Sequence, residues 1–342
     1  MKDFIKISKY AGMREDLVQA GGGNSSCKIS SDRMLIKASG VSLADLTETT
    51  GYAWINPSVI RDYFLTSDIA AITEEDSRQI LEKAFLKGEK PSIETFLHAF
   101  SGTYTLHTHP IVVNALTCRK GGMELLKKMF PQALLVPYAT PGAELARAYV
   151  LSYKKDFKNE KIPDVVFLQN HGLVVSGETS EAVIRKTEEI TDKIERFLKT
   201  DFRAYHDATK IWEMFEDQII WRVTDANVLR EYHRRGSIWQ YTFCPDCVVF
   251  LGKKILYLND KADRAQKEEF ENRYGTPVLI CYKGELYIAA DRVKKALEIQ
   301  SVLSFSAQVM EMNKEAECIF LPEQEQSDLL NWDAEKYRQT VT

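Results

Sequence analysis

The sequence lacks the features that mark membrane, secreted and nucleic-acid-binding proteins. None of its apolar runs approaches the roughly 20 residues of a membrane-spanning helix. The N-terminus, MKDFIKISKY, has neither the apolar core nor the small-residue cleavage site of a signal peptide. A net charge of −4 does not favour nucleic acid as the main partner. We therefore expect a cytoplasmic protein that binds neither a membrane nor nucleic acid.

Cysteine is scarce, and its distribution argues against a disulfide framework. Six cysteines are spread over 342 residues, which is typical of reduced thiols. Cys244 and Cys247 form a C-x-x-C pair, but a single pair of this kind makes a poor zinc site. The apolar residues Val248–Phe250 predict a strand after the pair, whereas a redox dithiol would precede a helix. We interpret the two residues as incidental thiols at the start of a strand.

The order of the predicted elements divides the chain into three parts. Apolar patterns of helical and strand-like period alternate, starting with a helix over Phe4–Ala20, and predict an α/β domain over residues 1–200. Residues 201–235 are rich in charge and aromatic side chains and predict a helical bridge. Residues 236–342 predict a smaller α+β appendage with a polar tail. No G-x-G-x-x-G motif follows a predicted strand, so a dinucleotide-binding fold is not supported.

The stretch PSIETFLHAFSGTYTLHTHP combines a carboxylate with two alternate histidines. Its apolar and β-branched residues predict a strand that runs into His107 and His109. Alternate side chains on a strand point to the same face, so both imidazoles could reach one ion. Glu94 lies upstream, on a predicted helix that Ser92 could cap. For His98, one helical turn after Glu94, we favour a packing role over a hydrogen bond near the site.

A third candidate ligand is His171, which follows a predicted buried strand and lies between an asparagine and a glycine. A tight turn there would hold the imidazole rigidly at the edge of the sheet. Three neutral imidazoles with an open position fit a catalytic zinc site, because structural sites close all four positions. Such a metal polarises a carbonyl, and Glu94 could then move a proton. Taken singly, each histidine is more simply explained as a polar group at a strand end.

Turns rich in glycine and serine offer a candidate anion pocket. Backbone N–H groups and hydroxyls are free to bind oxygens at such places. Lys28 and Lys37 could add positive charge. Each turn alone is an ordinary structural feature. The candidate segments are Gly23-Asn24-Ser25-Ser26, Ser39-Gly40 and the helix start at Ser92.

The order of these motifs resembles the class II aldolase/adducin family, which includes fuculose-phosphate and rhamnulose-phosphate aldolases and ribulose-phosphate 4-epimerase. The likeness rests on GGGNSS, KASG, PSIE, LHTHP and QNHGLVVSG, within residues 5–200. It implies an α/β/α sandwich around a mixed sheet, usually assembled as a homotetramer with sites at subunit interfaces. It also implies that His107, His109 and His171 hold Zn²⁺, or another divalent metal such as Mn²⁺, with Glu94 as the acid/base.

The resemblance implies a zinc-dependent aldolase that cleaves a (phospho)ketose to a dihydroxyacetone-type ketone and an aldehyde. A sugar-phosphate 4-epimerase and a non-catalytic, adducin-like binding protein are the alternatives. Members that bind phosphate commonly have two serines before the glutamate, and Ile93 replaces the second here. Whether the substrate is phosphorylated therefore stays open. By the resemblance, a substrate phosphate would contact Gly23, Asn24, Ser39, Gly40 and Ser92.

The C-terminal part resembles the tail of the aldolase half of bifunctional aldolase/short-chain dehydrogenases. This likeness rests on TFCPDCVVF, YKGELYIAAD and DLLNWDAEKY. Where those proteins commonly read Pro-Asp-His, this sequence has Pro245-Asp246-Cys247. Tyr138 is a weaker candidate for a side chain that reaches a neighbouring subunit's site.

Overall fold

The structure is a computed structural model, and its helices and strands fall into two compact units, Met1–Phe202 and Arg203–Thr342. The assignment of residues 201–235 as a separate bridge stays a prediction. No helix of the described part of the chain is long and apolar enough to cross a membrane. The structure describes residues 1–68, 71–157, 163–215, 217–236, 242–313 and 318–331.

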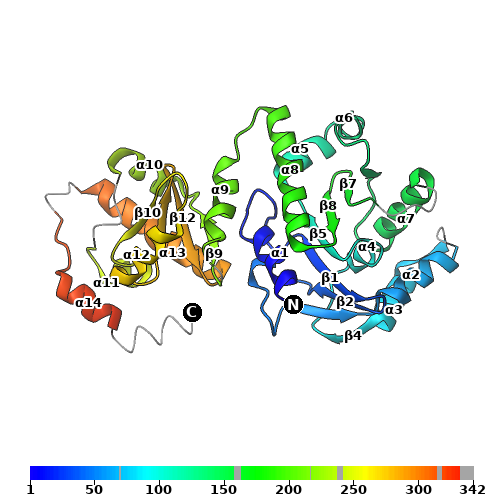
Figure 1. Cartoon of the computed structure of the whole chain (residues 1–342), viewed down its shortest axis with the longest axis horizontal. Coiled ribbons are helices and arrows are strands. Elements are labelled where there is room, and N and C mark those ends of the chain that lie inside the picture. The colour runs from blue at the N-terminus through cyan, green and yellow to red at the C-terminus, as the bar shows by residue number, and fades with distance from the viewer. Residues whose placement is uncertain (69–70, 158–162, 216, 237–241, 314–317, 332–342) are drawn as a thin grey trace. The chain divides into compact units, whose positions relative to one another are not determined.

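The first unit is built on an eight-stranded sheet with the order β4-β3-β2-β1-β5-β8-β7-β6 (Figure 1). Only β6 and β7 pair in parallel, and the other neighbours are antiparallel, so the sheet is mixed. The strands are β1 Asn24–Ser30, β2 Arg33–Lys37, β3 Tyr52–Ile55, β4 Phe85–Gly88, β5 Tyr104–Thr108, β6 Leu134–Val136, β7 Val165–Leu168 and β8 Gly172–Gly177.

Helices cover both faces of this sheet. The apolar residues of α2, α3, α4 and α7 form one core with those of β2, β3, β6 and β7. On the other face α8 contacts both α1 and α5, and these helices contact strands β1, β5 and β8. The predicted α/β/α sandwich is confirmed. The helices are α1 Lys2–Gly12, η1 Leu43–Asp45, α2 Pro57–Thr66, α3 Glu74–Ala84, α4 Thr95–Phe100, α5 Ile111–Thr117, α6 Gly122–Met129, α7 Ala143–Phe157 and α8 Ser180–Leu198.

The first helix ends at Gly12, so the prediction of a helix as far as Ala20 is wrong. The backbones of α1 and η1 approach so closely at Gly12 that a Cβ there would lie 2.1 Å from the backbone nitrogen of Ala44. After Gly12 the chain is no longer helical, and the polar groups of the next residues bind partners outside α1. The apolar periodicity of the segment reflects burial in irregular structure rather than a longer helix.

A buried ion network fixes the segment that follows α1. The Arg14 guanidinium is fully buried and binds the Asp16 carboxylate through two hydrogen bonds, of 2.9 and 2.6 Å, and also binds Glu188 on α8. The backbone carbonyls of this segment hold the end of β5, because Asp16 O accepts from Ile111 N and Leu17 O accepts from His109 N, at 2.9 and 2.8 Å. The network therefore supports the backbone of a candidate metal ligand.

The replacement Arg14→Ala is expected to destabilise the first unit by about 3–5 kcal/mol, because it leaves the Asp16 carboxylate buried without its partner. Urea unfolding of the full chain, followed by circular dichroism, measures the change. Arg78→Ala is the control, since the Arg78 ion pair with Glu75 is exposed at the surface and should not move the unfolding midpoint. Equal midpoints for the two variants would contradict the role given to Arg14.

The second unit contains a four-stranded sheet with the order β10-β11-β12-β9. Strand β9 lies within residues 201–235, so the prediction that this segment is entirely helical is wrong. β9 pairs antiparallel with β12, which makes it an edge strand of the second unit's sheet. The elements are α9 Arg203–Trp212, β9 Ile219–Arg222, α10 Ala226–Arg235, α11 Pro245–Leu251, β10 Ile255–Leu258, α12 Arg264–Tyr274, β11 Leu279–Tyr282, β12 Glu285–Ala290, α13 Val293–Met312 and α14 Glu323–Asn331.

The strand predicted over Val248–Phe250 is also wrong, because these residues belong to α11. Cys244 is the N-cap of this helix and Pro245 is its first residue, a position that suits proline because its missing N–H needs no partner there. A short buried helix and a short buried strand can both consist of consecutive apolar residues. The apolar pattern therefore could not distinguish the two kinds of element here.

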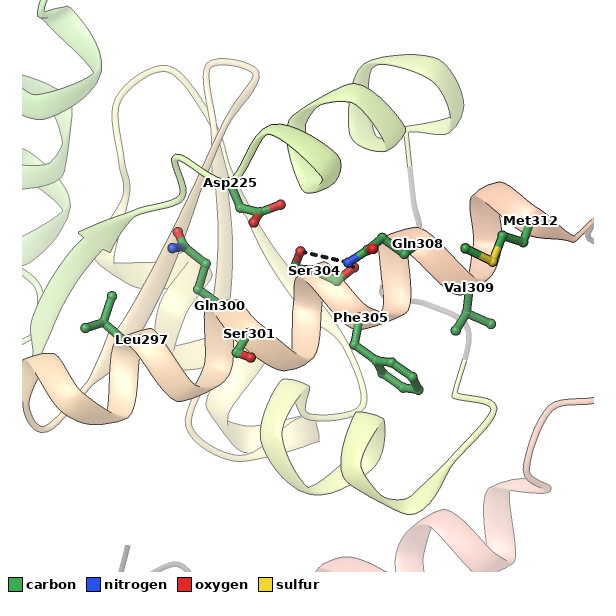
Figure 2. A pocket seen from close by; sticks show the side chains of 9 residues that line it. All are labelled: Asp225, Leu297, Gln300, Ser301, Ser304, Phe305, Gln308, Val309 and Met312. Atoms are coloured by element: carbon green, nitrogen blue, oxygen red, sulfur yellow. Dashed lines mark hydrogen bonds between the residues drawn. The ribbon is translucent and has the colours of Figure 1, made fainter.

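A hollow of about 640 Å³ runs along α13 (Figure 2). Asp225 is the one titratable residue among those that line it. Its carboxylate accepts hydrogen bonds from the backbone nitrogens of Asn227 and Val228 and caps α10. The hollow therefore has no group of convergent reactive side chains, and the chemistry lies elsewhere.

Candidate functional site

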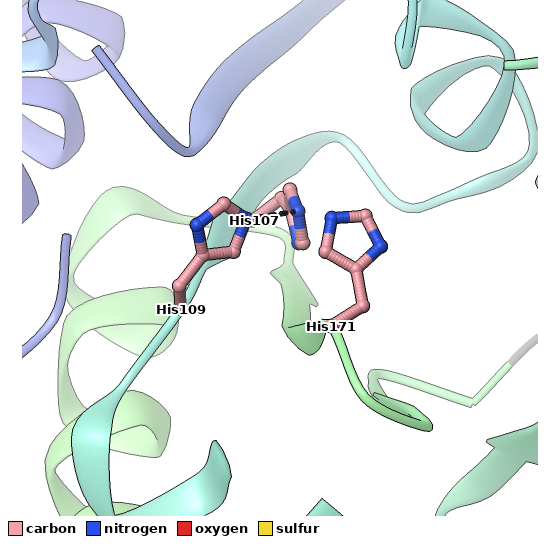
Figure 3. Close-up of side chains that lie close together, drawn as sticks. All are labelled: His107, His109 and His171. Carbon is pink, nitrogen blue, oxygen red and sulfur yellow. Dashed lines mark hydrogen bonds between the residues drawn. The ribbon is translucent and has the colours of Figure 1, made fainter. Parts of the chain in front are cut away.

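Three histidines converge at the end of strand β5 (Figure 3). His107 is on β5, His109 follows that strand, and His171 is in the turn between β7 and β8. β5 and β8 are paired antiparallel, with His107 opposite Val174, so the β7–β8 turn lies beside the end of β5. One ring nitrogen of each histidine lies within 4.8 Å of those of the other two.

The hydrogen bonds of the site leave ligand nitrogens facing one another. His107 Nδ1 donates to the backbone carbonyl of Leu173 at 3.0 Å, which leaves Nε2 as the unprotonated nitrogen of a neutral ring. His107 Nε2 lies 3.1 Å from His109 Nε2. Two nitrogens bound to one tetrahedral zinc at about 2.0–2.1 Å would be roughly 3.3 Å apart. The donor set and its spacing therefore fit a metal ion.

The backbone around the site requires glycine and asparagine at two positions. Asn170 has a φ of 54°, in the left-handed region that asparagine tolerates, and so turns the chain before His171. A Cβ at Gly172 would lie 2.3 Å from the backbone oxygen of Thr108, so only glycine lets β8 start beside β5. The motif NHG thus places His171 against the histidine pair of β5.

Burial keeps the imidazoles of His107 and His109 neutral, which is the form that binds metal. Burial lowers the pKa of His107, and it lowers the pKa of His109 to about 3, helped by the neighbouring imidazoles. Both rings are therefore ready to act as ligands at neutral pH.

Glu94 faces the same point between the imidazoles. Its Oε1 lies 3.1 Å from His171 Nε2 and its Oε2 lies 3.5 Å from His107 Nε2. Burial opposes the charged form, but His107, His171 and a hydrogen bond from Asn24 hold the pKa of the carboxyl well below its usual range. The predicted helical position of Glu94 is wrong, because α4 begins at Thr95 and Glu94 is its N-cap residue. The result is an ionised carboxylate beside the three imidazoles.

The orientation of Glu94 depends on Asn24 and His98. Asn24 Nδ2 donates to Glu94 Oε2 at 2.5 Å, and the Asn24 carbonyl oxygen binds His98 Nε2. His98 is fully buried, and burial lowers its pKa to about 3, so the ring is neutral. Since the amide oxygen can only accept, His98 Nε2 donates, and Nδ1 accepts from the Ser26 hydroxyl at 2.7 Å. His98 is therefore a link to the carboxylate, so the packing role favoured from the sequence is wrong, and its place one turn after Glu94 is the signal for the hydrogen-bonding role.

The two lysines that were expected to add positive charge, Lys28 and Lys37, bind backbone carbonyls, and their contribution to an anion pocket stays a prediction. Lys28 Nζ donates to the backbone oxygens of His98, Ser101 and Gly102 at the end of α4, the first at 2.7 Å. Lys37 Nζ donates to the oxygens of Ala38 and Val41, at 3.1 and 2.7 Å. Lys37 thus braces the turn that carries Ser39 and Gly40.

The residues of the glycine-serine turns lie near Glu94 in two groups. Gly23 has a φ of 68°, and a Cβ there would lie 2.8 Å from the backbone oxygen of His107. Ser92 Oγ accepts from Asn24 Nδ2 at 3.3 Å. Ser39 N donates to Lys90 O at 2.8 Å, and an isolated bridge joins Ala38 to Pro91. The turn with Ser39 and Gly40 therefore lies beside the segment that leads to Ser92 and Glu94.

A cavity of about 1010 Å³ adjoins these turns. Ser39 and Ile93 contribute to its wall, and the Ile93 side chain is 57% exposed. Ile93 also lies against Gly142, where a Cβ would be 3.2 Å from Ile93 Cδ1. An apolar side chain thus occupies the wall next to the carboxylate. The other lining residues are Glu74, Glu75, Ser77, Arg78, Leu81, Glu82, Phe85, Lys90, Pro91, Phe96, Pro141, Gly142 and Ala143.

Comparison with known families decides what kind of domain carries this site. The model of the Class II Aldolase and Adducin N-terminal domain matches residues 2–197. The chain belongs to the class II aldolase/adducin family. The match covers the whole of the sandwich that holds the three histidines and Glu94, which agrees with the resemblance seen in the motifs.

Relatives of this aldolase-family chain match a little more than half of it. The uncharacterized oxidoreductase YuxG of Bacillus subtilis (strain 168) is 26% identical over 210 residues, which cover 58% of this chain. The chain spans only 29% of the length of that relative. An N-terminal class II aldolase domain from Thermoplasma acidophilum is 25% identical, with a TM-score of 0.49, and the match covers 57% of this chain and 92% of that one. An l-fuculose-1-phosphate aldolase from Thermus thermophilus is 17% identical, with a TM-score of 0.36, over 61% and 95% of the two chains.

The geometry predicts that His107→Ala, His109→Ala and His171→Ala each lose bound zinc. Each replacement removes one of three nitrogens around the same point, and two imidazoles hold the ion far more weakly. Metal content is measured by mass spectrometry after incubation with zinc and dialysis. His233→Ala, an exposed histidine of α10, is the matched control and should keep the wild-type content. Zinc retained at full stoichiometry in a triad variant would contradict the predicted site.

Proposed function

We propose that this chain is a metal-dependent carbon–carbon lyase, a zinc-dependent class II aldolase that cleaves a ketose. The observation that carries the proposal is that three imidazoles converge on a point that the Glu94 carboxylate also faces. Family membership supports lyase chemistry, although the family also has members that are not lyases.

In the proposed mechanism the protein supplies the ligands and the proton acceptor. Zinc, or another divalent metal such as Mn²⁺, held by His107, His109 and His171 would supply a Lewis acid that polarises the carbonyl and lowers the pKa of the neighbouring C–H of the dihydroxyacetone-type ketone. In cleavage the ionised Glu94 takes up the hydroxyl proton that the new aldehyde loses and delivers it to the ketone carbon, and in aldol addition it takes the proton back from that carbon. The hydrogen bond from Asn24 keeps the carboxylate oriented for both steps.

The proposed substrate is a ketose that yields a dihydroxyacetone-type ketone and an aldehyde. We propose that the oxygens at its ketone end, or a phosphate attached there, contact the two glycine-serine turns around Glu94. Ile93 provides no hydroxyl in this wall, and Lys37 is bound to backbone carbonyls. Both features reduce the number of groups that could donate hydrogen bonds to a substrate phosphate. Free ketoses are therefore candidates beside ketose phosphates. The proposed contacts are Gly23, Asn24, Ser39, Gly40 and Ser92.

Two alternatives use the same fold. A sugar-phosphate 4-epimerase would break and remake the same bond without releasing the fragments. An adducin-like binding protein would need neither the histidines nor the carboxylate, and their convergence favours catalysis. We also propose assembly as a homotetramer in the cytoplasm, in line with the family resemblance.

The zinc-loaded chain is expected to release an aldehyde from at least one member of a panel of ketose 1-phosphates and free ketoses. A coupled dehydrogenase assay that traps the free aldehyde measures the reaction. Formation of an epimer without free aldehyde would establish the epimerase instead. A zinc-loaded protein that converts none of the sugars would contradict both enzymatic functions.

Glu94→Gln is expected to lower kcat by about 10²–10⁴-fold and to keep the bound zinc, because the amide keeps the shape but cannot accept the proton. Glu189→Gln, on the exposed face of α8, is the control and should leave kcat unchanged. Zinc content is measured on the same samples. A Glu94→Gln enzyme with wild-type kcat would refute the acid/base role.

His98→Leu is expected to lower kcat about 10–100-fold with KM and zinc content unchanged, because the Asn24 amide loses the partner that orients it. His98→Gln should recover part of the activity, since its side-chain N–H can donate to the same oxygen. Steady-state kinetics and thermal unfolding are measured together. A loss of stability with normal kcat would show that His98 serves packing alone.

A further inference from the structure

The C-x-x-C pair of the second unit has a geometry that the sequence did not predict. Cys244 is the N-cap of α11 and Cys247 lies in the helix's first turn, so the helical turn brings the two side chains together. The sulfur atoms are 3.3 Å apart, and both residues are free thiols. A disulfide bond is about 2.05 Å long, so closure needs a movement of roughly 1.3 Å. Side-chain rotation is sufficient for a movement of this size.

The two thiols differ in their surroundings. Cys247 is 1% exposed, and its Sγ lies 3.1 Å from the Ser306 hydroxyl on α13. Cys244 is partly exposed. Burial raises the pKa of the Cys247 thiol to about 12, so this residue is protonated at neutral pH. The accessible Cys244 is therefore the sulfur that meets a reagent from solvent, and Cys247 is the second sulfur behind it.

We propose that Cys244 and Cys247 form a redox-active dithiol, which a disulfide-bearing oxidant such as oxidised glutathione converts to an intramolecular disulfide. The thiolate of Cys244 attacks one sulfur of the oxidant, forms a mixed disulfide and releases one thiolate. The sulfur of Cys247 gives its proton to solvent and attacks Cys244 Sγ, which breaks the mixed disulfide and releases the second thiolate. The two cysteines are oxidised by two electrons, and the oxidant is reduced to two thiols.

Formation of the disulfide is expected to change the packing of α11. This helix contacts α13 and α14, and the Ser306 hydroxyl that contacts Cys247 belongs to α13. Formation of the disulfide removes the Cys247 thiol from that hydrogen bond. The redox state of the pair is thus linked to the contact between α11 and α13, within the second unit and independently of the three histidines.

The test exposes the 342-residue chain to oxidised glutathione, followed by acid quenching and thiol titration under denaturing conditions. Both thiols of the pair are expected to be lost from the wild-type count of six. Peptide mapping by mass should find Cys244 linked to Cys247, with the loss of two hydrogens and no glutathione on either residue. Dithiothreitol should restore all six thiols.

Three single variants separate the roles of the sulfurs. Cys247→Ser should accumulate one glutathione adduct on Cys244, because the second sulfur is missing. Cys244→Ser should leave the buried Cys247 unmodified. Cys118→Ser, at an exposed cysteine of the first unit, is the control and should form the disulfide as the wild type does.

Other outcomes would overturn the proposal. These are six titratable thiols after oxidation, a stable glutathione adduct on Cys244 of the wild type, or a disulfide between two chains. Circular dichroism of each variant checks that it is folded. The assay measures neither zinc content nor aldolase activity. The disulfide result can therefore be interpreted even if the chain proves not to be an aldolase.

Discussion

The candidate site depends on the antiparallel pairing of β5 with β8. This pairing places Leu173 opposite Thr108, and the carbonyl of Leu173 accepts the Nδ1 proton of His107. The pairing of β5 with β8 thus brings the β7–β8 turn to the histidine pair. It also selects the tautomer of His107 whose Nε2 can bind a metal. The close approach of the two strands excludes any side chain at position 172, which explains the glycine after His171.

Polar groups that are remote in sequence support this arrangement. The Arg14 network fixes the backbone that holds His109, and the link from His98 through Asn24 orients Glu94. Each of these groups is buried and hydrogen-bonded, which is the condition under which a buried polar group costs little. The ammonium groups of the half-buried Lys28 and the buried Lys37 also bind backbone carbonyls, at the end of α4 and in a turn. Hydrogen-bonded polar groups therefore surround the site.

Much of this could be predicted from the sequence, since the motifs are local. The alternation of His107 and His109, the NHG turn and the glycine-serine segments each predict a local geometry, and the family match confirms the fold. What could not be predicted depends on tertiary contacts. The partners of Lys28 and the early end of α1 arise where segments far apart in the chain meet. The sequence predicts a strand where the short helix α11 lies, because a few buried apolar residues have no decisive period.

We propose that the three imidazoles hold a catalytic metal beside an ionised Glu94. Anomalous diffraction at the zinc absorption edge, on crystals of the zinc-loaded chain, tests it most directly. One strong peak is expected about 2.0–2.1 Å from a nitrogen each of His107, His109 and His171, with the Glu94 carboxylate alongside. The absence of a peak between the three rings, or zinc bound only at other residues, would contradict it.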